Sequence, residues 1–343
     1  MKASKIISMV IAGVMAVSFT GCIKKLDSAK DKTVVAKVGD ATITVADVRK
    51  TMSQDIDSIK QQYGNGYLNN SEAMTSLKST AKTTLDNLVN TKLFYFEAKT
   101  LKLVPDLNHI DDEVQKEIDL TKKDSFDNDE TKFEKALSDA GYTLDTYKFA
   151  IRESLKDNPE SFAANRVKDY YTSKVTVSDS EISSQYYTDI SKYTTQPGAE
   201  MYNIVIPTEA EAKQVRADIL SGKATFADMA KKYNTDSTKD NGGDLGYVTY
   251  ENSGMVTEFI DAAKKLKEGE LSQPVKSQFG WHLIKVTGVV TQSKVKPLSE
   301  VKDTVKAGVL STKKNQAVTD EITKLKTKYK VTTYESKLDS NIY

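Results

Sequence analysis

The sequence predicts an α+β protein in which a small antiparallel sheet with surrounding helices is inserted into a mostly α-helical domain built from both ends of the chain. Three observations predict this plan. Helix-breaking segments at 194–198 and 293–297 enclose a region of mixed strand and helix patterns. The segment before this region opens with a hairpin whose outer edge has no partner. The segment after it holds a helix with an uncovered apolar stripe, so the two flanks complete each other by packing together.

The chain begins with a pattern typical of a secretory signal peptide, which we expect over residues 1–21. Two lysines precede the uncharged apolar run 6–19, which is shorter than the roughly 20 residues that span a bilayer. The run is followed by Thr20-Gly21-Cys22, which resembles a bacterial lipobox. Cys22 is the only cysteine, so it has no internal disulfide partner, and a free thiol is the alternative to lipid attachment. We expect residues 22–33 to be a lipidated cysteine with a polar tether.

Composition argues against several classes of function. The 49 Lys and Arg residues nearly balance the 48 Asp and Glu residues, so we expect no basic face for nucleic acid. Two histidines and one cysteine argue against a zinc site, and no phosphate-binding loop is present. We therefore expect no metal and no cofactor. A solute-binding lipoprotein is disfavoured because no two-lobed α/β pattern is present.

The N-terminal flank, 34–196, reads as a hairpin followed by helices. Two β-prone runs, 34–38 and 41–45, surround Gly39-Asp40 and predict the hairpin. Thr44 and Asp47 form a capping box that opens a helix. The apolar residues of this helix recur at helical spacing at Val45, Val48, Met52, Ile56 and Ile59. Further helices are expected near 71–103, 111–124, 129–140, 143–157, 160–173 and 178–193, the last opened by Ser178 and Glu181.

The inserted region, 197–292, reads as strand, helices, strand, helix and two further strands. The expected bounds are 202–206 for the first strand, 209–220 for a helix, a helix capped by Thr225 and Asp228, a helix opened by Thr257, and strands 271–275 and 280–286. Alternation in the last strand places His282, Ile284 and Val286 on one face and Trp281, Leu283 and Lys285 on the other.

The C-terminal flank, 293–343, reads as a long helix over 298–329 and a short strand over 330–334. The inward stripe of the helix is expected to be Val301, Val305, Val309, Val318, Ile322 and Leu325. These residues need a partner surface outside their own segment, which the N-terminal flank supplies.

The inserted region resembles the parvulin family of peptidyl-prolyl cis/trans isomerases. The resemblance rests on Met-Tyr-Asn-Ile-Val-Ile at 201–206, Gly-Gly-Asp-Leu-Gly at 242–246 and Gly-Trp-His-Leu-Ile-Lys-Val at 280–286. The discontinuous plan and the stretch from Val35 to Thr44 also resemble PrsA, a family of exported foldase lipoproteins. The flanks would then form a chaperone domain. Parvulins usually end the first strand in His-Ile-Leu, and here the His position is Asn203.

The resemblance implies a proline-binding site with a polar cluster. Met255, Phe259 and Leu245 would hold the proline ring, and the catalytic cluster would be Asn203, Asp236 and His282. Rotation about the peptide bond has a barrier of roughly 18–20 kcal/mol, and cis and trans are close in energy before proline. An apolar pocket that disfavours the planar, charge-separated amide complements the twisted transition state.

Each of these residues also has an ordinary structural explanation. His282 could be a hydrogen-bonded strand histidine, and Asp236 could be a turn residue. Met255 and Phe259 could be core residues, and the glycines of 242–246 are best explained by backbone freedom.

The sequence therefore predicts a membrane-anchored foldase on the extracytoplasmic face of the cell membrane. It would act as a peptidyl-prolyl cis/trans isomerase and as a chaperone for unfolded secreted polypeptides that contain X-Pro bonds. The alternative is a holdase chaperone whose parvulin-like domain binds peptide with little or no catalysis, because Asn203 replaces the usual histidine. A homodimer through the helical domain is one expectation for the oligomeric state.

Overall fold

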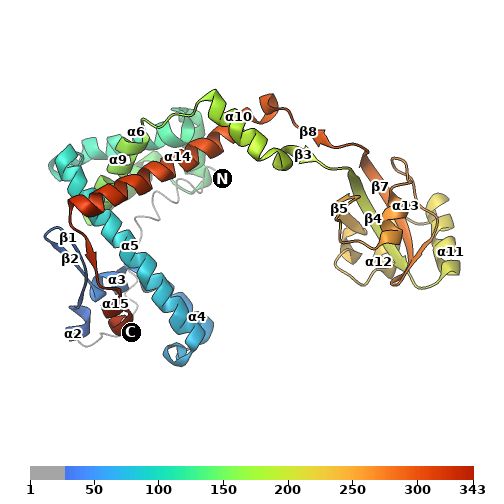
Figure 1. The fold of residues 1–343 in the computed structure, drawn as a ribbon, viewed down its shortest axis with the longest axis horizontal. Coiled ribbons are helices and arrows are strands. Elements are labelled where there is room, and N and C mark those ends of the chain that lie inside the picture. Colours follow the sequence, from blue (N-terminus) through green and yellow to red (C-terminus); the bar gives the residue numbers. More distant parts are fainter. Residues whose placement is uncertain (1–27) are drawn as a thin grey trace. The chain divides into compact units, whose positions relative to one another are not determined.

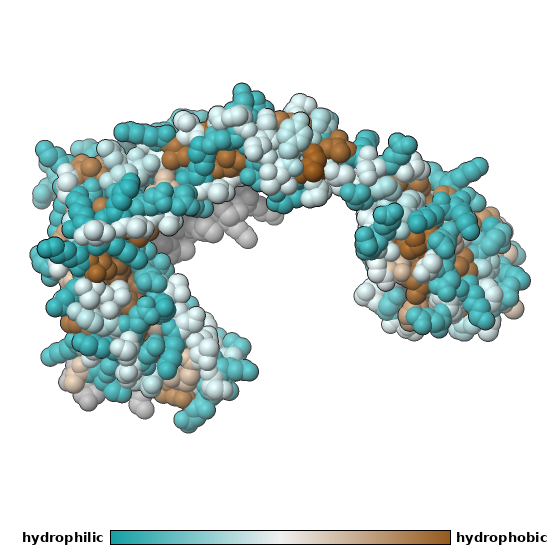
Figure 2. Space-filling view, viewed as in Figure 1, coloured by the Kyte–Doolittle hydropathy of each residue, from teal (hydrophilic) through white to brown (hydrophobic). Residues whose placement is uncertain are grey.

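A computed structural model describes residues 28–343 and divides the chain into two compact units (Figure 1). One unit joins the chain up to Thr176 with Leu310–Tyr343, and the other is Val177–Val309. Helices and antiparallel strands confirm the α+β class. Hydrophilic side chains cover most of the visible surface of each unit (Figure 2). The predicted signal peptide and Cys22 lie outside the described residues.

The helical unit, which contains both ends of the chain, is built mainly from helices. Its elements are α2 Ser28–Asp31, β1 Val34–Val38, β2 Ala41–Thr44, α3 Val45–Thr51, α4 Ser53–Tyr63, η1 Tyr67–Asn69, α5 Ser71–Leu101, η2 Leu107–His109, α6 Ile110–Phe126, α7 Glu130–Asp139, α8 Leu144–Asp157, α9 Pro159–Thr172, the second part of α14 Leu298–Lys328, β9 Thr332–Thr333 and α15 Glu335–Asn341. Among residues 28–343, no helix combines the length and the apolar character needed to cross a membrane.

The start of the helical unit follows the predicted hairpin and capping box. The Thr44 backbone N–H donates to Asp47 Oδ2 at 2.8 Å, and the Asp47 N–H donates to Thr44 Oγ1. The single helix predicted after Thr44 is wrong, because the backbone leaves helical geometry at Met52, where ψ is 20°. All the apolar residues predicted for this helix are nevertheless buried. The break redirects the chain while both helices keep their apolar sides in one core.

The two chain ends of the helical unit share one sheet and one core. Strand β9 pairs antiparallel with β1, so the sheet order is β2-β1-β9 and the exposed edge of the hairpin is covered. Val318, Ile322 and Leu325 of α14 pack on the same core as α5 and the hairpin. Helix α15, which the sequence analysis did not predict, adds the buried Leu338 to this core, and Ile342, which follows the helix, adds a second buried apolar side chain. Packing between the two flanks is therefore apolar and continuous.

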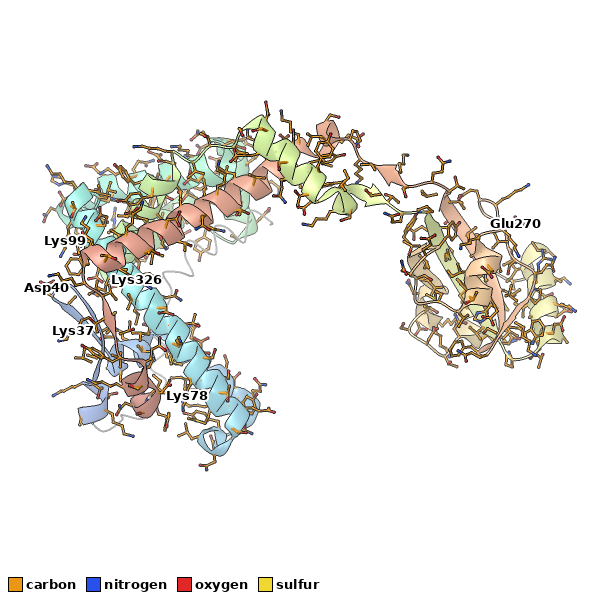
Figure 3. All side chains as sticks on the ribbon, in the orientation of Figure 1. Lys37, Asp40, Lys78, Lys99, Glu270 and Lys326 are labelled. Carbon is orange, nitrogen blue, oxygen red and sulfur yellow. The ribbon has the colours of Figure 1, made fainter. Side chains whose placement is uncertain are left out.

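A buried carboxylate holds the end of α14 against α5 and α9. Glu97 accepts hydrogen bonds from Lys328 Nζ at 2.5 Å, from Tyr329 Oη at 2.9 Å and from Tyr171 Oη at 3.1 Å. Burial by itself would raise the pKa of Glu97, but these three donors outweigh it and lower the pKa. Further along α5, Lys78 (labelled in Figure 3) lies over the ring of the C-terminal Tyr343.

The second unit contains a four-stranded antiparallel sheet in the order β5-β4-β7-β6. Its elements are α10 Asp179–Thr188, η3 Ile190–Tyr193, β3 Thr194–Thr195, β4 Gly198–Ile206, α11 Glu209–Leu220, α12 Phe226–Tyr233, η4 Lys239–Asn241, β5 Asp244–Thr249, α13 Thr257–Ala263, β6 Val275–Ser277, β7 Gly280–Val290, β8 Lys294–Val295 and the first part of α14. The bounds predicted for α11 match the structure, and Thr225 caps α12 as expected.

The strand predicted over 271–275 is wrong. Leu271 makes only an isolated bridge with Lys285, and β6 begins at Val275. The Ile284 N–H donates to Ser272 Oγ at 2.8 Å in place of a backbone carbonyl, and Pro274 has no N–H to offer a neighbouring strand. A regular ladder therefore cannot form before Val275.

The sheet separates two apolar cores, as the predicted alternation along β7 requires. Leu283 packs with α11 and α12 on one face, whereas Ile284 and Val286 pack with Phe259 of α13 on the other. His282 shares the face of Ile284, so the strand directs its ring toward α13. The fold thereby places the histidine under one helix rather than in solvent.

Candidate functional site

Three uncharged side chains form a hydrogen-bonded network on the α13 face of the sheet. Nδ1 of the buried His282 lies 3.0 Å from Asn203 Oδ1, and its Nε2 lies 2.6 Å from Ser277 Oγ. Because the amide oxygen can only accept, Nδ1 donates to it, and Nε2 accepts from the Ser277 hydroxyl. Both ring nitrogens are therefore satisfied with His282 neutral.

The electrostatics favour the same neutral form of His282. Burial lowers the pKa of the imidazole, and the carboxylate of Glu258 raises it only in part. Neither Asn203 nor Ser277 carries a charge that would stabilise the imidazolium. The ring therefore acts as a neutral group with a defined tautomer.

Strand register brings the three residues together across β4, β7 and β6. Asn203 pairs with Ile284, and Val205 pairs with His282, so Asn203 and His282 are diagonal neighbours on one face. On the other side of β7, Ser277 pairs with Gly280, which makes Ser277 a diagonal neighbour of His282 as well. The network therefore runs across three strands.

Close backbone packing holds Asn203 in place. Its N–H donates to the Gly243 carbonyl at 2.9 Å, and its carbonyl accepts from Asn234 Nδ2 at 2.9 Å. Gly243 has φ +79°, and a Cβ there would lie 2.5 Å from the Asn203 carbonyl oxygen. Glycine is thus required twice, by backbone conformation and by space, which agrees with the structural explanation given for segment 242–246.

Asp236 lies in the turn that follows α12. Its Oδ1 accepts from the Thr238 N–H at 2.9 Å and from the Thr238 hydroxyl at 2.6 Å. Among the hydrogen bonds of residues 28–343, none joins Asp236 to His282 or to the Asn203 side chain. It is linked to the Asn203 backbone indirectly, from Thr238 through either Asn234 or Gly243. The structure therefore brings together two members of the predicted cluster and leaves Asp236 at its margin, in a turn.

The three residues expected to hold proline surround His282 to different degrees. Phe259 is buried, and its ring meets the His282 ring edge-on, with centroids 5.7 Å apart and planes at 75°. Leu245 is half-buried on the same core, whereas Met255 is exposed in the segment before α13. Phe259 thus supports the histidine, while Leu245 and Met255 have surface available for a ligand.

Ser277 is the member of the network that the sequence analysis missed. It ends β6, and a two-residue turn separates it from Gly280, whose φ is +130°. The Phe279 N–H donates to Ser277 Oγ at 3.0 Å and leaves the hydroxyl hydrogen for His282. The glycine before Trp281-His282 is the signal that could have located this hairpin.

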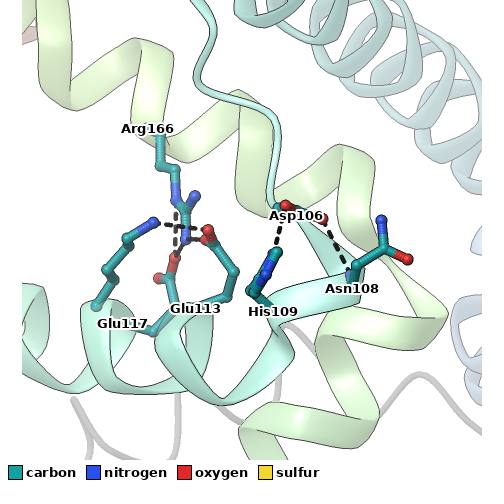
Figure 4. A network of polar contacts seen from close by, with 7 residues as sticks. Asp106, Asn108, His109, Glu113, Glu117 and Arg166 are labelled. Carbon is teal, nitrogen blue, oxygen red and sulfur yellow. Dashed lines mark hydrogen bonds and ion pairs between the residues drawn. The ribbon is translucent and has the colours of Figure 1, made fainter.

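A second polar cluster lies in the helical unit and is ionic (Figure 4). Arg166 of α9 reaches Glu117 Oε1 through Nε at 2.9 Å and through a terminal nitrogen at 2.6 Å. The same terminal nitrogen lies 2.6 Å from Glu113 Oε2, and Lys116 Nζ lies 2.7 Å from Glu113 Oε1. The side chains of Arg166 and Glu113 are only 12% and 4% exposed.

The pKa values of the two carboxylates of this cluster shift in opposite directions, although burial raises both. For Glu113, burial would raise the pKa, but the hydrogen bonds from Lys116 and Arg166 outweigh it and lower the pKa. For Glu117, burial raises the pKa and Arg166 offsets only part of the rise. Arg166 and Glu113 also line a cavity of about 870 Å³, together with apolar residues Leu103, Val104, Leu120 and Tyr170.

Two families match this chain. Residues 206–288 match the PPIC-type PPIase domain, and residues 1–158 match the SurA-like N-terminal domain. The first match contains His282 and Ser277 of the network and most of β7, and it begins just after Asn203. The isomerase-type match and the chaperone-type match therefore fall in different parts of the sequence.

Relatives named foldase protein PrsA match nearly the whole chain. One from Clostridium kluyveri is 37% identical over 327 residues and covers 94% of each chain. One from Clostridium botulinum strain Okra is 33% identical over 342 residues, which is 98% of this chain and 99% of the relative. The solved structure of the peptidylprolyl isomerase PrsA from Bacillus anthracis covers 73% of this chain and 99% of its own, with 24% identity and a TM-score of 0.26.

Proposed function

This chain belongs to the PrsA family of foldases, and from this premise we propose that it isomerises X-Pro bonds at the site around His282 in secreted polypeptides. The chain is a foldase with a peptidyl-prolyl isomerase domain and a SurA-like chaperone domain. The observation that carries the site assignment is the neutral network of Asn203, His282 and Ser277 beside Phe259.

The proposed mechanism requires no covalent step and no charged catalyst. Met255 and Leu245, with Phe259 behind them, hold the proline ring, and the rotating carbonyl faces the neutral network. Planar amide resonance separates charge between oxygen and nitrogen, so an apolar, uncharged pocket disfavours the planar form relative to the twisted one. The Asn203 side-chain NH2 donates to the carbonyl, and His282 orients that amide by donating from Nδ1 to its Oδ1. Asp236 acts indirectly, by supporting the turn that holds the Asn203 backbone.

A proline-isomerisation assay on the full chain tests this assignment. We expect measurable activity on a tetrapeptide, and Met255→Ala should lower it because an exposed wall of the proline site is removed. Leu220→Ala is the matched control, since Leu220 is an exposed apolar residue of the same unit outside the site. Equal rates for Met255→Ala and the control would remove Met255 from the site. No activity in the wild type would favour the peptide-binding holdase instead.

We further propose the domain division 34–196 with 293–343 for the chaperone body and 197–292 for the isomerase domain. The pairing of β9 with β1 and the contacts of Glu97 support a body that closes without the insert. Joining 33–196 to 294–343 should therefore give a folded helical protein that suppresses aggregation of a refolding client. If it folds and aggregation is unchanged, the chaperone role of the body is wrong.

Anchoring through Cys22 completes the proposal. The lipobox-like Thr20-Gly21-Cys22 supports lipid attachment after removal of residues 1–21, with 22–33 as the tether on the extracytoplasmic face of the membrane. Cys22→Ala should release the protein from the membrane fraction or leave it unprocessed. Mass spectrometry showing an unmodified Cys22 in the native protein would contradict the anchor. The expected homodimer through the helical domain is tested by sedimentation of the chain lacking residues 1–22.

A further inference from the structure

We propose that Phe279 and Glu258 set the preference of the isomerase site for the residue that precedes the client's proline. Phe279 contacts an apolar side chain at that position, and Glu258 disfavours an acidic or phosphorylated one. This inference rests on the proposed function, because it adds a specificity to the site around His282. The preferred client segment is therefore an apolar, uncharged residue followed directly by proline.

Phe279 occupies an exposed place that the fold itself does not explain. It lies in the two-residue turn between β6 and β7, and its side chain is 66% exposed. Its backbone N–H donates to Ser277 Oγ, so the turn is tied directly to the network that holds His282. An exposed phenyl ring contributes little to burial in the folded unit. Beside a peptide site, the same ring offers a large, rigid apolar contact.

The chemistry of the reaction decides which client residue reaches Phe279. The carbonyl that rotates belongs to the residue before proline, and in the proposed mechanism it faces His282 and Asn203. The side chain of that residue therefore leaves the site next to the network. Ser277 ends the network at the outer strand β6, and Phe279 follows two positions later. The preceding residue is consequently the one whose side chain can meet the phenyl ring.

Glu258 gives this site a negative field. It is exposed in the first turn of α13 and directly precedes Phe259, whose ring contacts His282. Its carboxylate is close enough to His282 to raise the pKa against the lowering by burial. The cation of the hairpin lies elsewhere, because Lys276 Nζ is 5.8 Å from the Trp281 ring centroid, on the face opposite His282. A phosphate or carboxylate before proline would meet repulsion from the Glu258 carboxylate.

Tetrapeptides of the form Ala-X-Pro-Phe test the proposal on the full chain. X is Leu, Ala, Glu or phosphoserine, and kcat/KM is measured for the wild type, Phe279→Ala and Glu258→Gln at low salt. Phe149→Ala is the matched control for Phe279, since Phe149 is 65% exposed in the helical unit. Glu209→Gln is the control for Glu258, because Glu209 pairs with Lys213 on the surface of α11.

The two parts of the proposal predict separate changes. Phe279→Ala should reduce the Leu-to-Ala ratio of kcat/KM by about fivefold, because an apolar contact to the client is lost. Glu258→Gln should raise kcat/KM for the Glu and phosphoserine peptides about threefold relative to Leu, and added salt should reduce this gain. The controls should leave all ratios unchanged. These changes would support the assignment of both residues.

The assay distinguishes an error in the specificity assignment from an error in the proposed isomerase function. If the wild type is active and Phe279→Ala leaves the Leu-to-Ala ratio unchanged, the Phe279 contact is overturned. If Glu258→Gln leaves the ratio of Glu to Leu unchanged, the repulsion by Glu258 is overturned. If the folded wild type isomerises none of the peptides, the isomerase function fails and the specificity proposal fails with it. Circular dichroism on every variant confirms that the comparison is made between folded proteins.

Discussion

The two polar networks of this protein are built on opposite principles. The isomerase unit buries His282 between an amide and a hydroxyl, and none of the three groups carries a charge. The helical unit buries Arg166 between two carboxylates. The chain's two histidines follow the same division, because His109 of the helical unit is exposed and bonded to the Asp106 carboxylate. One network suits a site that acts on a neutral amide, and the other joins two helices.

The two networks differ in how well they tolerate a substitution. A buried ion pair adds little net stability, but removing one partner leaves an uncompensated charge in a poorly solvated place. A change in a neutral network leaves at most an unpaired polar group, which costs about 1–3 kcal/mol and thus less than an unpaired buried charge. This contrast explains how Asn203 can replace the histidine usual in parvulins while the network stays closed.

The largest effect is expected from Arg166→Met. It leaves Glu113 and Glu117 buried without their shared cation, and we expect a loss of about 3–5 kcal/mol in the stability of the helical unit at neutral pH. Arg152→Met is the matched control, because Arg152 and its partner Asp111 are 40% and 77% exposed, and it should cost less than about 1 kcal/mol. Urea unfolding followed by far-UV circular dichroism measures both. Equal losses would show that burial of the network does not matter.

Gly243→Ala should disturb the neutral network through its backbone. A Cβ at Gly243 would lie 2.5 Å from the Asn203 carbonyl oxygen, whereas Gly222 has a similar φ and open space around it. Both substitutions carry about 1 kcal/mol of backbone cost, and the clash should add about 1–2 kcal/mol at Gly243 alone. Trp281 is the only tryptophan, so its fluorescence follows unfolding of the isomerase unit. Identical midpoints for the two variants would contradict the clash.

Asn203→His tests whether the neutral network limits catalysis. An imidazole at 203 can still accept from His282 Nδ1, and it restores the ring that parvulins usually carry. Turnover should rise by about fivefold, the value of one neutral hydrogen bond, while KM stays nearly constant because the change acts on the transition state. The assay is proline isomerisation on one tetrapeptide. A change in KM alone would show that Asn203 binds the ground state instead.

The smallest effect is a difference between two titrations. The hydrogen bond that His109 donates to Asp106, together with the charge of Asp106, raises the pKa of His109 above its ordinary value of 6.5, whereas burial lowers the pKa of His282 below 6.5. Nuclear magnetic resonance of the two imidazole signals during a pH titration should resolve them. His109→Gln assigns the signals. Two superimposed curves would remove the electrostatic contrast between the units.

The same shifts predict opposite pH dependence of stability. The folded pKa of His282 is depressed, so its contribution is present above 6.5 and is lost as the pH falls toward the folded pKa. The folded pKa of His109 is raised, so its contribution is present below 6.5 and is lost as the pH rises through the folded pKa. Trp281 fluorescence and far-UV circular dichroism report on the two units separately.

Local signals in the sequence were sufficient for most elements. The capping boxes at Thr44 and Ser178 and the bounds of α11 were predicted and are present in the structure. The alternation that directs His282 toward α13 was also predicted, as was packing of the two flanks. The caps, the bounds of α11 and the alternation along β7 depend on residue spacing over a few turns or a few strand positions, so neighbouring residues suffice to specify them. Packing of the two flanks was predicted from the uncovered strand edge and apolar stripe that each flank shows by itself.

The two wrong predictions of elements share one cause, which is that packing with the rest of the fold replaced a local pattern. The strand predicted over 271–275 fails because Ser272 and Pro274 interrupt the ladder against β7. The helix after Thr44 breaks at Met52, where the chain turns to keep both halves in one core. Asp236 was grouped with His282 by resemblance, yet its own turn takes up its carboxylate. Spacing alone does not reveal which partner a side chain finds.

Residue patterns were enough to specify most of the helices and strands and the face of β7 that carries His282, because periodicity and capping act between residues close in the chain. The neighbours of that histidine, in contrast, are set by tertiary contacts. Asn203 lies 79 positions away in the sequence, and strand register makes it a neighbour. Ser277 joins through a hairpin whose register depends on the whole sheet. The neutral state of the ring follows from burial, which is a property of packing and not of any one residue.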